Sequence, residues 1–192
     1  ADCDLKPLVL AAKEGLSLIN GTSQIIAWLS ISYAVLRDLI PFCDLVLSAS
    51  IEATNSSAAP ADERLHEVRP HSGQSLVATR IRRALAKSEI LASHSDCDKV
   101  QDPYSFRCAP QVHGPANEAL QKLYEVIFIE LNSATDNPLI FADENVSGPH
   151  EVVSGGNFHG EILGLVADAM NAAVFELASI SERRMDTMLD AS

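Results

Sequence analysis

Basic residues are scarce in this chain of 192 residues: 14 Lys and Arg stand against 26 Asp and Glu, which gives a formal net charge of −12 at pH 7. Nucleic-acid backbones and anionic membrane surfaces attract proteins that carry an excess of positive charge. The acidic balance therefore argues against either of them as a partner.

Long runs of uncharged apolar residues are missing as well. No run approaches the roughly 18 to 20 apolar residues of a membrane-spanning helix, and the chain starts without the basic stretch of a signal peptide. Hydrophobic residues still make up 47% of the sequence, enough for a sizeable core, and the length suits one domain. We therefore expect a cytoplasmic protein without a membrane partner.

Closely spaced cysteine pairs are also absent, since the four cysteines are scattered and form no Cys-x-x-Cys motif. A disulfide framework is not expected, and free thiols are. One alternative is a tetrahedral zinc site, because His94-x-x-Cys97 and Cys108-x-x-x-x-His113 could supply two imidazoles and two thiolates. The ample apolar content argues against a need for metal, so we predict no metal site.

Apolar residues recur at helical spacing almost everywhere outside a few polar loops. The spacing predicts helices over residues 8–19, 22–40 with a continuation over 45–53, 76–90, from about 115 to 131, and 161–189. Asn20 and Gly21 suit the end of the first helix, and Pro41 is expected to kink or interrupt the second. Ser72 is expected to cap the third. Strand-like alternation is weak, so the fold is predicted to be all-α, a long-helix bundle with functional loops.

The most informative loop has the sequence DKVQDPYSFRCAPQVHG, residues 98–114. A tyrosine hydroxyl can pass a proton, and a guanidinium can hold a carboxylate with two parallel hydrogen bonds. Tyr104 and Arg107, three residues apart, therefore suit an amino-acid substrate, and Gln101 could share their surface. The structural alternative is that Arg107 forms an ion pair and that Tyr104 anchors the loop.

Together with four other segments, this loop resembles the aromatic amino acid ammonia-lyases. The four segments occur in the family's order: LAAKEGLSLINGT (10–22), ELNSATDNPLIF (130–141), VVSGGNFHGE (152–161) and SERR (181–184). The resemblance runs from near one end of the chain to the other and is weaker over residues 23–64. It implies that residues 1–192 form a single partial domain, part of the central helical domain of these lyases.

The resemblance implies catalytic roles for three residues. Asn20 matches an asparagine that hydrogen-bonds the family's electrophilic ring, Tyr104 a tyrosine that contacts the ring, and Phe158 an aromatic residue packed near it. Taken without the resemblance, Asn20 suits a helix C-cap and Phe158 a core position. The family's base is ascribed to a tyrosine on an N-terminal loop that this sequence does not contain, so Tyr104 is expected to have a supporting role.

Three further residues are expected to bind the substrate. Arg107 matches an arginine that clamps the substrate carboxylate, whereas Gln101 and Asn137 match polar residues around that carboxylate and the ring. On its own, Asn137 would be a turn residue, because it precedes Pro138.

The reaction that the resemblance implies removes ammonia from an aromatic α-amino acid and needs no soluble cofactor. The electrophile of the family is a methylidene-imidazolone group (MIO), formed when an Ala-Ser-Gly tripeptide cyclises and loses water. This sequence has no Ala-Ser-Gly, since its Ser-Gly pairs follow His71, Val146 and Val153. We therefore expect an internal piece of a longer enzyme, inactive by itself and completed by further segments or a companion chain.

Histidine, which would give urocanate, is the favoured small-molecule substrate, because residues 94–114 are more similar to the family's histidine enzymes than to its phenylalanine enzymes. A tyrosine or phenylalanine lyase, a 2,3-aminomutase and a non-catalytic helical scaffold stay open. The family implies a homotetramer whose active sites combine residues from several subunits. Tyr104 and Phe158 therefore need not serve the same pocket.

Overall fold

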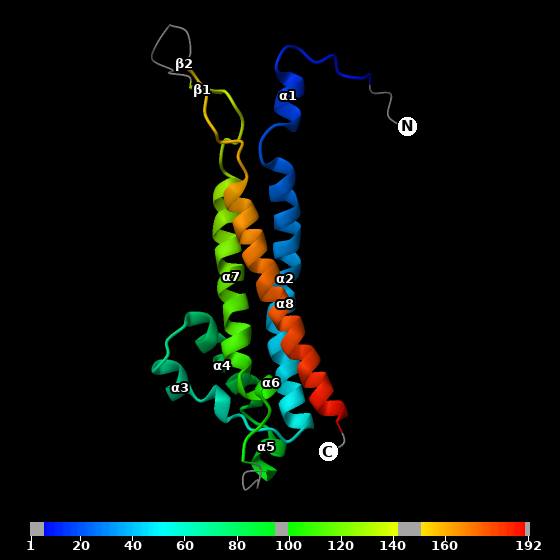
Figure 1. Ribbon diagram of the computed structural model, residues 1–192, viewed down its shortest axis with the longest axis vertical. Helices are drawn as coiled ribbons and strands as arrows, with labels where there is room; N and C mark the ends of the chain where they lie inside the picture. Colours follow the sequence, from blue (N-terminus) through cyan, green and yellow to red (C-terminus); the bar gives the residue numbers. More distant parts are fainter. Residues whose placement is uncertain (1–5, 95–99, 142–150, 191–192) are drawn as a thin grey trace.

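Three long helices dominate the structure, a computed structural model that describes residues 6–94, 100–141 and 151–190. They are α2 (Ser23–Ala53), α7 (Ala109–Glu130) and α8 (Glu161–Leu189), and they run side by side (Figure 1). At a rise of about 1.5 Å per residue, α2 alone is roughly 45 Å long. The predicted all-α bundle is confirmed.

The shorter elements gather at the two ends of the three long helices (Figure 1). One end, which we call the hairpin end, holds α1 (Glu14–Ile19) and an antiparallel pair of short strands, β1 (Leu139–Phe141) and β2 (Glu151–Val153). The other end, which we call the α6 end, holds the remaining elements: η1 (Ala59–Ala61), α3 (Glu63–Glu67), α4 (Ser72–Leu85), α5 (Glu89–Ser93) and α6 (Tyr104–Arg107). Polar loops thus lie at both ends of the three long helices, which we call the stem.

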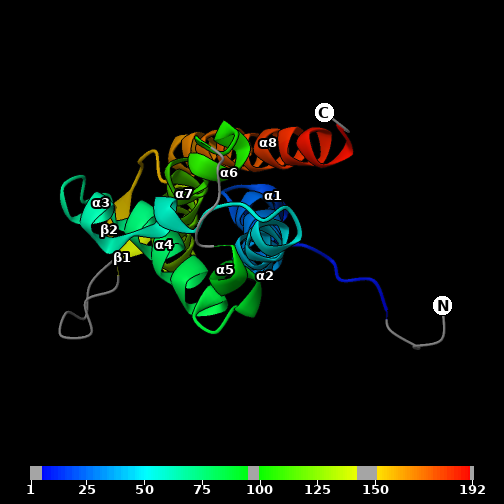
Figure 2. The same cartoon turned by 90° about the horizontal axis from the view of Figure 1, so that it is seen from below.

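The hydrophobic core has two parts along this stem. One lies between α2, α7 and α8 and includes Ile40, Leu123 and Leu163, all fully buried. The other lies at the α6 end, where α4 packs against α2 and α7 through residues such as Val77 and Leu47. Seen from below, α4 and α8 lie on opposite sides of α7 (Figure 2). The bundle therefore contains four helices, α2, α4, α7 and α8, only at the α6 end.

The long helices tolerate two prolines that the sequence analysis treated as boundaries. Pro41 lies inside α2, which continues through it, so of the two predicted effects, a kink or an interruption, the interruption is wrong. Ile40 and Leu47 are fully buried on either side of Pro41, and packing outweighs the lost backbone hydrogen bond. Pro115 lies inside α7, which begins at Ala109 instead of near residue 115.

The first and third predicted helices are shorter than expected, whereas the last is confirmed at Glu161–Leu189. The first covers only Glu14–Ile19, but it ends as predicted at Asn20, and Gly21 has a φ of 91° that favours glycine. Ser72 is the first residue of α4 and not its cap, and α4 ends at Leu85. Ser88 then caps the separate helix α5 through its hydroxyl.

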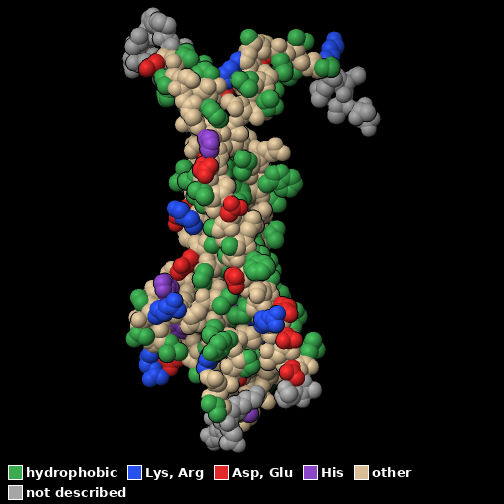
Figure 3. Space-filling model, in the orientation of Figure 1, with side chains coloured by type: hydrophobic (Ala, Val, Ile, Leu, Met, Phe, Trp, Pro, Cys, Tyr) green, Lys and Arg blue, Asp and Glu red, His purple; other side chains and the backbone are tan. Residues whose placement is uncertain are grey.

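Large apolar side chains cover the outer faces of α2 and α8. On α2, Trp28 and Val35 are about two-thirds exposed, and on α8, Leu165 and Phe175 are equally open. Charged side chains on the face shown in Figure 3 gather mainly toward the α6 end. Apolar surface of this extent on several helices marks a protein interface more often than a free surface.

Within the described residues, α8 is long and apolar enough to cross a membrane by length and composition alone, with a mean hydropathy of 1.5 over 18 residues, of which 17% are buried in this chain. It carries Asp168 and Glu176, however. A carboxylate near the centre of a bilayer costs roughly 2.5 to 3.5 kcal/mol. Protein is therefore a better cover for α8 than lipid.

Two glycines set the distance between α4 and α7. A Cβ on Gly73 would lie 2.1 Å from the carbonyl oxygen of Gly114, and a Cβ on Gly114 would lie 2.6 Å from the backbone nitrogen of Gln74. We expect Gly73→Ala to lower the free energy of unfolding by about 1 to 3 kcal/mol, because the backbones must separate. Thermal denaturation of the complete protein measures this, with Arg83→Ala on the exposed side of α4 as the control. Equal melting temperatures for the two variants would contradict the close approach.

Candidate active site

At the hairpin end, Asn20 is fixed by a residue far away in the sequence. The turn between α1 and α2 packs closely on the loop before β1, since a Cβ on Gly21 would lie 2.4 Å from the carbonyl oxygen of Thr135. This approach lets the Asn20 side-chain amide donate a hydrogen bond of 2.7 Å to Oδ1 of Asp136. Asn20 thus both ends α1, as its backbone suggested, and holds a defined side-chain position.

Asp136 is the centre of the polar contacts at this end. Besides Asn20, its carboxylate accepts hydrogen bonds from Lys13 Nζ at 2.7 Å, from Ser17 Oγ at 3.2 Å and from the backbone N–H of Asn137 at 2.7 Å. The Lys13 ammonium, the Asn137 N–H and the Asn20 amide hold the pKa of the Asp136 carboxyl well below its usual range. Asp136 therefore ties α1 to the Asn-Pro loop.

Asn137 is linked through its own side chain to the segment before α8. Its Oδ1 accepts hydrogen bonds from the backbone N–H of Gly155 at 2.7 Å and from the hydroxyl of Ser154 at 3.1 Å, and its peptide bond to Pro138 is cis. Phe158 follows in this segment and is 42% exposed, so it is not a core residue of this chain. Asn20, Asn137 and Phe158 accordingly lie at the same end, the first two joined through Asp136.

At the α6 end, the structure brings together the other three predicted residues. Arg107 donates a hydrogen bond to Oε1 of Gln101, and its guanidinium lies 4.7 Å from the centre of the Tyr104 ring. Tyr104 is 68% exposed, so it does not anchor a buried loop. In the part of the chain that the structure describes, Arg107 forms no ion pair. Its guanidinium can therefore take the carboxylate of a ligand.

The loop that carries these residues has a firm attachment on its N-terminal side. Asp102 is buried and accepts a hydrogen bond of 2.7 Å from the backbone N–H of Ser57. A cavity of about 830 Å³ opens beside Arg107 and Gln101, bounded on the far side by the η1 segment. Space for a small ligand is thus present next to the Arg107 guanidinium, which has no carboxylate partner among the described residues.

The zinc alternative finds no support in these contacts. His113 is fully buried, with Nδ1 2.7 Å from Oδ1 of Asp44 and Nε2 3.4 Å from Arg184, so both ring nitrogens are engaged. Cys97 lies outside the described residues. Among the residues that are described, no group of three or more His, Cys, Asp and Glu could hold a metal ion, and Cys43 and Cys108 are free thiols as predicted.

The two groups of site residues are far apart within one chain. Phe158 lies just before the first residue of α8, whereas α6 contacts α8 near Arg184, close to its other end. The 24 residues from Glu161 to Arg184 span about 35 Å of helix. We call the two groups of predicted site residues half sites, and a single pocket cannot use both groups from the same copy.

Sequence reasoning missed the residues that hold each half site in place. Asp136 was read only as part of a motif, and nothing local shows that it bonds Asn20, 116 residues away. Asp44 stands in the apolar run LIPFCDLVL, where a lone carboxylate needs a partner, and this is a signal that could have been used. It bonds both His113 and Arg80.

A stem of long helices with amide, tyrosine and arginine side chains in the polar segments at its two ends defines the class of this protein, a helical bundle with functional loops. The chain belongs to the aromatic amino acid lyase family, whose model matches residues 1–192.

The relatives agree with this assignment. A probable histidine ammonia-lyase of Halobacterium salinarum is 47% identical over 99% of this chain, which covers 37% of that protein. The histidine ammonia-lyase structure from Trypanosoma cruzi is 42% identical with a TM-score of 0.81, over 97% of this chain and 33% of that one. A phenylalanine aminomutase from Pantoea agglomerans is 33% identical with a TM-score of 0.84, over 97% and 38%. The chain spans about a third of the length of these relatives.

The ion pair at Asp136 makes the hairpin end sensitive to acid. A carboxyl with a folded pKa below its ordinary value of 3.8 stabilises the fold above that pH, and the contribution is lost as the pH falls toward the folded pKa. We expect amide hydrogen exchange around Asn20 and Asn137, corrected for intrinsic rates, to lose protection below about pH 4.

Asp136→Asn should remove this pH dependence and expose the same amides at neutral pH. Asp62→Asn is the matched control, because its Arg64 partner lowers the pKa of Asp62 to about 2 at the opposite end. If Asp136→Asn left the exchange around Asn20 unchanged, Asp136 would not be the residue that holds this loop.

Proposed function

We propose that this chain is the central helical part of an ammonia-lyase that eliminates ammonia from L-histidine to give urocanate. The observation that carries the proposal is Arg107, a partly buried cation without a carboxylate partner among the described residues, beside an exposed tyrosine. The printed names of the similar proteins from Halobacterium and Trypanosoma support histidine as the substrate. Because the chain spans a third of those proteins, the activity is proposed for the complete protein.

At the α6 end, Arg107 would clamp the substrate carboxylate. Its guanidinium can offer two parallel N–H groups, and Gln101 fixes one side of it by accepting a hydrogen bond. Tyr104, stacked on the same guanidinium, would point its hydroxyl at the reacting carbons and assist proton transfer. The substrate is thereby held in line for loss of its β-hydrogen and amino group.

At the hairpin end, Asn20, Asn137 and Phe158 would border the electrophile. The family's methylidene-imidazolone group has no precursor in this chain, so a segment outside these 192 residues would have to supply it. The residues present fit such a group, because the Asn20 amide is fixed by Asp136 and keeps a second N–H for a ring carbonyl. When bound, the group supplies the electron sink that makes the β-hydrogen removable.

Neighbouring copies of the chain would combine the two half sites. Since Tyr104 and Phe158 lie at opposite ends of the long helices, an antiparallel neighbour would bring its hairpin end to the α6 end of the first copy. The exposed apolar faces of α2 and α8 would be covered in the same step, and the small residues Ala169 and Ala172 on α8 permit close helix contact. A homotetramer is the assembly we propose.

A second candidate is a 2,3-aminomutase or a lyase of another aromatic amino acid. The aminomutase of Pantoea agglomerans superposes on this chain as well as the histidine enzyme does, and its printed name gives phenylalanine as its substrate. Both reactions need a carboxylate clamp and an electrophile. A cytoplasmic location is part of the proposal too, since free thiols are typical of a reducing compartment.

The substrate is tested with the complete protein by following absorbance in the urocanate band after histidine is added. We expect growth of that band with histidine and none with tyrosine or phenylalanine. Growth of a coumarate or cinnamate band instead, or release of a β-amino acid, would overturn the substrate assignment.

Arg107→Ala should raise KM by about 10- to 100-fold with a smaller change in kcat, because a charged hydrogen bond to the substrate contributes about 1.5 to 3 kcal/mol. The KM of Arg107→Lys should lie between those of the wild-type protein and of Arg107→Ala, because an ammonium keeps the charge but lacks the paired N–H groups. Arg37→Ala, at an exposed arginine of α2, is the control. Unchanged KM in Arg107→Ala would contradict the clamp.

The combination of half sites from different copies is tested by mixing two inactive variants. Asn20→Ala disables one end and Tyr104→Phe the other. If each site takes its ends from two copies, a co-expressed equal mixture should regain about a quarter of the wild-type sites, since each end is intact half of the time. Activity no higher than that of either variant alone would show that one copy supplies both ends.

A further inference from the structure

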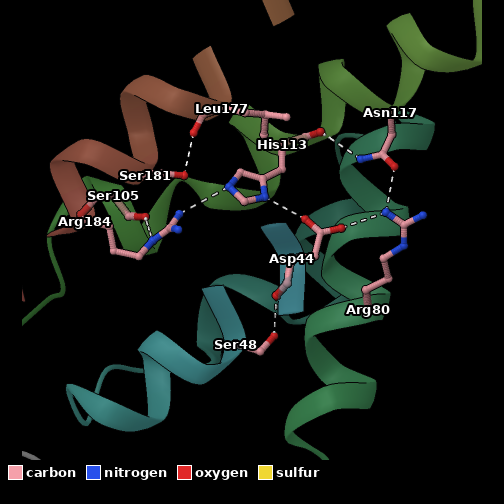
Figure 4. Close-up of polar contacts among 9 residues, drawn as sticks. All are labelled: Asp44, Ser48, Arg80, Ser105, His113, Asn117, Leu177, Ser181 and Arg184. Carbon is pink, nitrogen blue, oxygen red and sulfur yellow. Dashed lines mark hydrogen bonds and ion pairs between the residues drawn. The ribbon is translucent and has the colours of Figure 1, made fainter. Parts of the chain in front are cut away.

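A buried polar network crosses the stem next to the α6 end (Figure 4). Asp44 of α2 is 1% exposed, and its two carboxylate oxygens accept hydrogen bonds from different helices: Oδ2 from Arg80 of α4 at 2.8 Å, and Oδ1 from Nδ1 of His113 of α7 at 2.7 Å. On the other side of the His113 ring lies Arg184 of α8, 2% exposed. The network therefore connects all four helices of this end.

The partners of His113 determine its tautomer. Arg184 lies 3.4 Å from Nε2, and a guanidinium can only donate hydrogen bonds, so Nε2 is the acceptor. The hydrogen of the ring is then on Nδ1 and points to Asp44. His113 therefore links the Asp44 carboxylate to Arg184, because each of its ring nitrogens bonds one of these two neighbours.

Arg184 in turn contacts the two inner residues of α6. Its Nε donates a hydrogen bond of 3.2 Å to the backbone carbonyl of Ser105, and its guanidinium carbon lies 5.8 Å from the centre of the Phe106 ring. Ser105 and Phe106 are buried, whereas Tyr104 and Arg107 on either side of them face outward. The contact thus holds the inner face of the helix whose outer face carries the half site.

A helix as short as α6 cannot hold its own direction. It has four residues, and isolated helices of fewer than about 12 residues are marginal even in favourable sequences. Its N-terminal side is attached through Asp102, but that contact lies before Pro103. The direction in which Tyr104 and Arg107 point is therefore set by the junction with α7 at Cys108 and by what touches Ser105 and Phe106.

We propose that Arg184, held by the Asp44–His113 pair, is the positioning residue that aims Tyr104 and Arg107 at the substrate. The proposal rests on the proposed function for its effect on activity, but the contact with α6 can be tested without it. Arg184 is separated from solvent and from the substrate cavity, so its effect passes through the backbone of α6 and not through contact with the ligand.

The test compares Arg184→Met with Arg183→Met in the complete protein. Arg183 is the neighbouring arginine, is exposed, and among the described residues forms ion pairs with Glu182 and Asp186 of its own helix alone. In Arg184→Met, Asp44 keeps Arg80 and His113 as partners, so no buried carboxylate is left without one. The substitution therefore removes the contacts of Arg184 with α6 and with His113 and leaves both ion pairs of Asp44 in place.

We expect Arg184→Met to speed amide hydrogen exchange over residues 103–108 by about 10-fold or more while other segments stay protected. Its kcat/KM should fall by about 100-fold, with KM raised and kcat lowered together, because the side chains of Arg107 and Tyr104 both lose their fixed orientation toward the substrate. Arg183→Met should change neither readout. A purely structural role would instead reduce the amount of active enzyme and leave KM as it was.

Two conservative changes at His113 refine the test, together with Arg184→Lys. His113→Gln places an amide oxygen where Nε2 accepts from Arg184, whereas His113→Asn places an amide N–H where Nδ1 donates to Asp44. We expect His113→Gln to keep more of the kcat/KM than His113→Asn at similar stability, and Arg184→Lys to restore part of what Arg184→Met loses, since an ammonium can still reach the Ser105 carbonyl.

Unchanged exchange over residues 103–108 in Arg184→Met would overturn the positioning role whatever the activity. If Arg184→Met does not fold, the exchange in Arg184→Lys and the order of the two His113 variants decide the matter, and equal kinetics in those two would also overturn it. A wild-type protein without activity on aromatic amino acids, combined with faster exchange in Arg184→Met, would overturn the proposed function and leave the contact with α6 established.

Discussion

The length of the three central helices is the constraint on which the rest of this structure depends. Because α2, α7 and α8 run without interruption, the loops at their ends are held apart by a distance that no side chain can bridge. Each loop is then organised separately, around Asp136 at one end and around Arg184 at the other. A rigid stem of this kind makes the geometry of each half site independent of the other.

Buried charge has a particular part in this arrangement. The stem is apolar along most of its length, and a core of leucine and isoleucine alone leaves helices free to slide by a turn at little cost. Asp44, His113 and Arg184 remove that freedom, because any slip would leave a buried carboxylate or guanidinium without its partner. Burial lowers the pKa of the Arg184 guanidinium below its ordinary value, because a buried charge loses its hydration by water.

The sequence predicted local features well and distant contacts poorly. The end of α1 at Asn20, the start of α2 at Ser23 and the whole of α8 follow from capping residues and apolar spacing, and Gln101, Tyr104 and Arg107 meet because they are neighbours in the chain. The interruption predicted at Pro41 was wrong because burial of the residues on both sides outweighs the backbone hydrogen bond that proline removes.

The attachments of Asn20 to Asp136 and of Arg184 to Ser105 join segments more than 75 residues apart, and spacing in one sequence carries no information on such pairs. The short strands β1 and β2 were not predicted, because three residues are too few to show an alternation of apolar and polar side chains.

The exposed apolar faces of α2 and α8 have a consequence for the assembly of the protein. The helices that expose them are the same helices that separate the half sites, so covering the faces and completing a reaction centre are one event under the proposed function. Under that proposal, a lone subunit would bind the carboxylate of an amino acid at its α6 end without an electrophile beside it. Under the same proposal, the reaction would begin only after newly made chains have assembled.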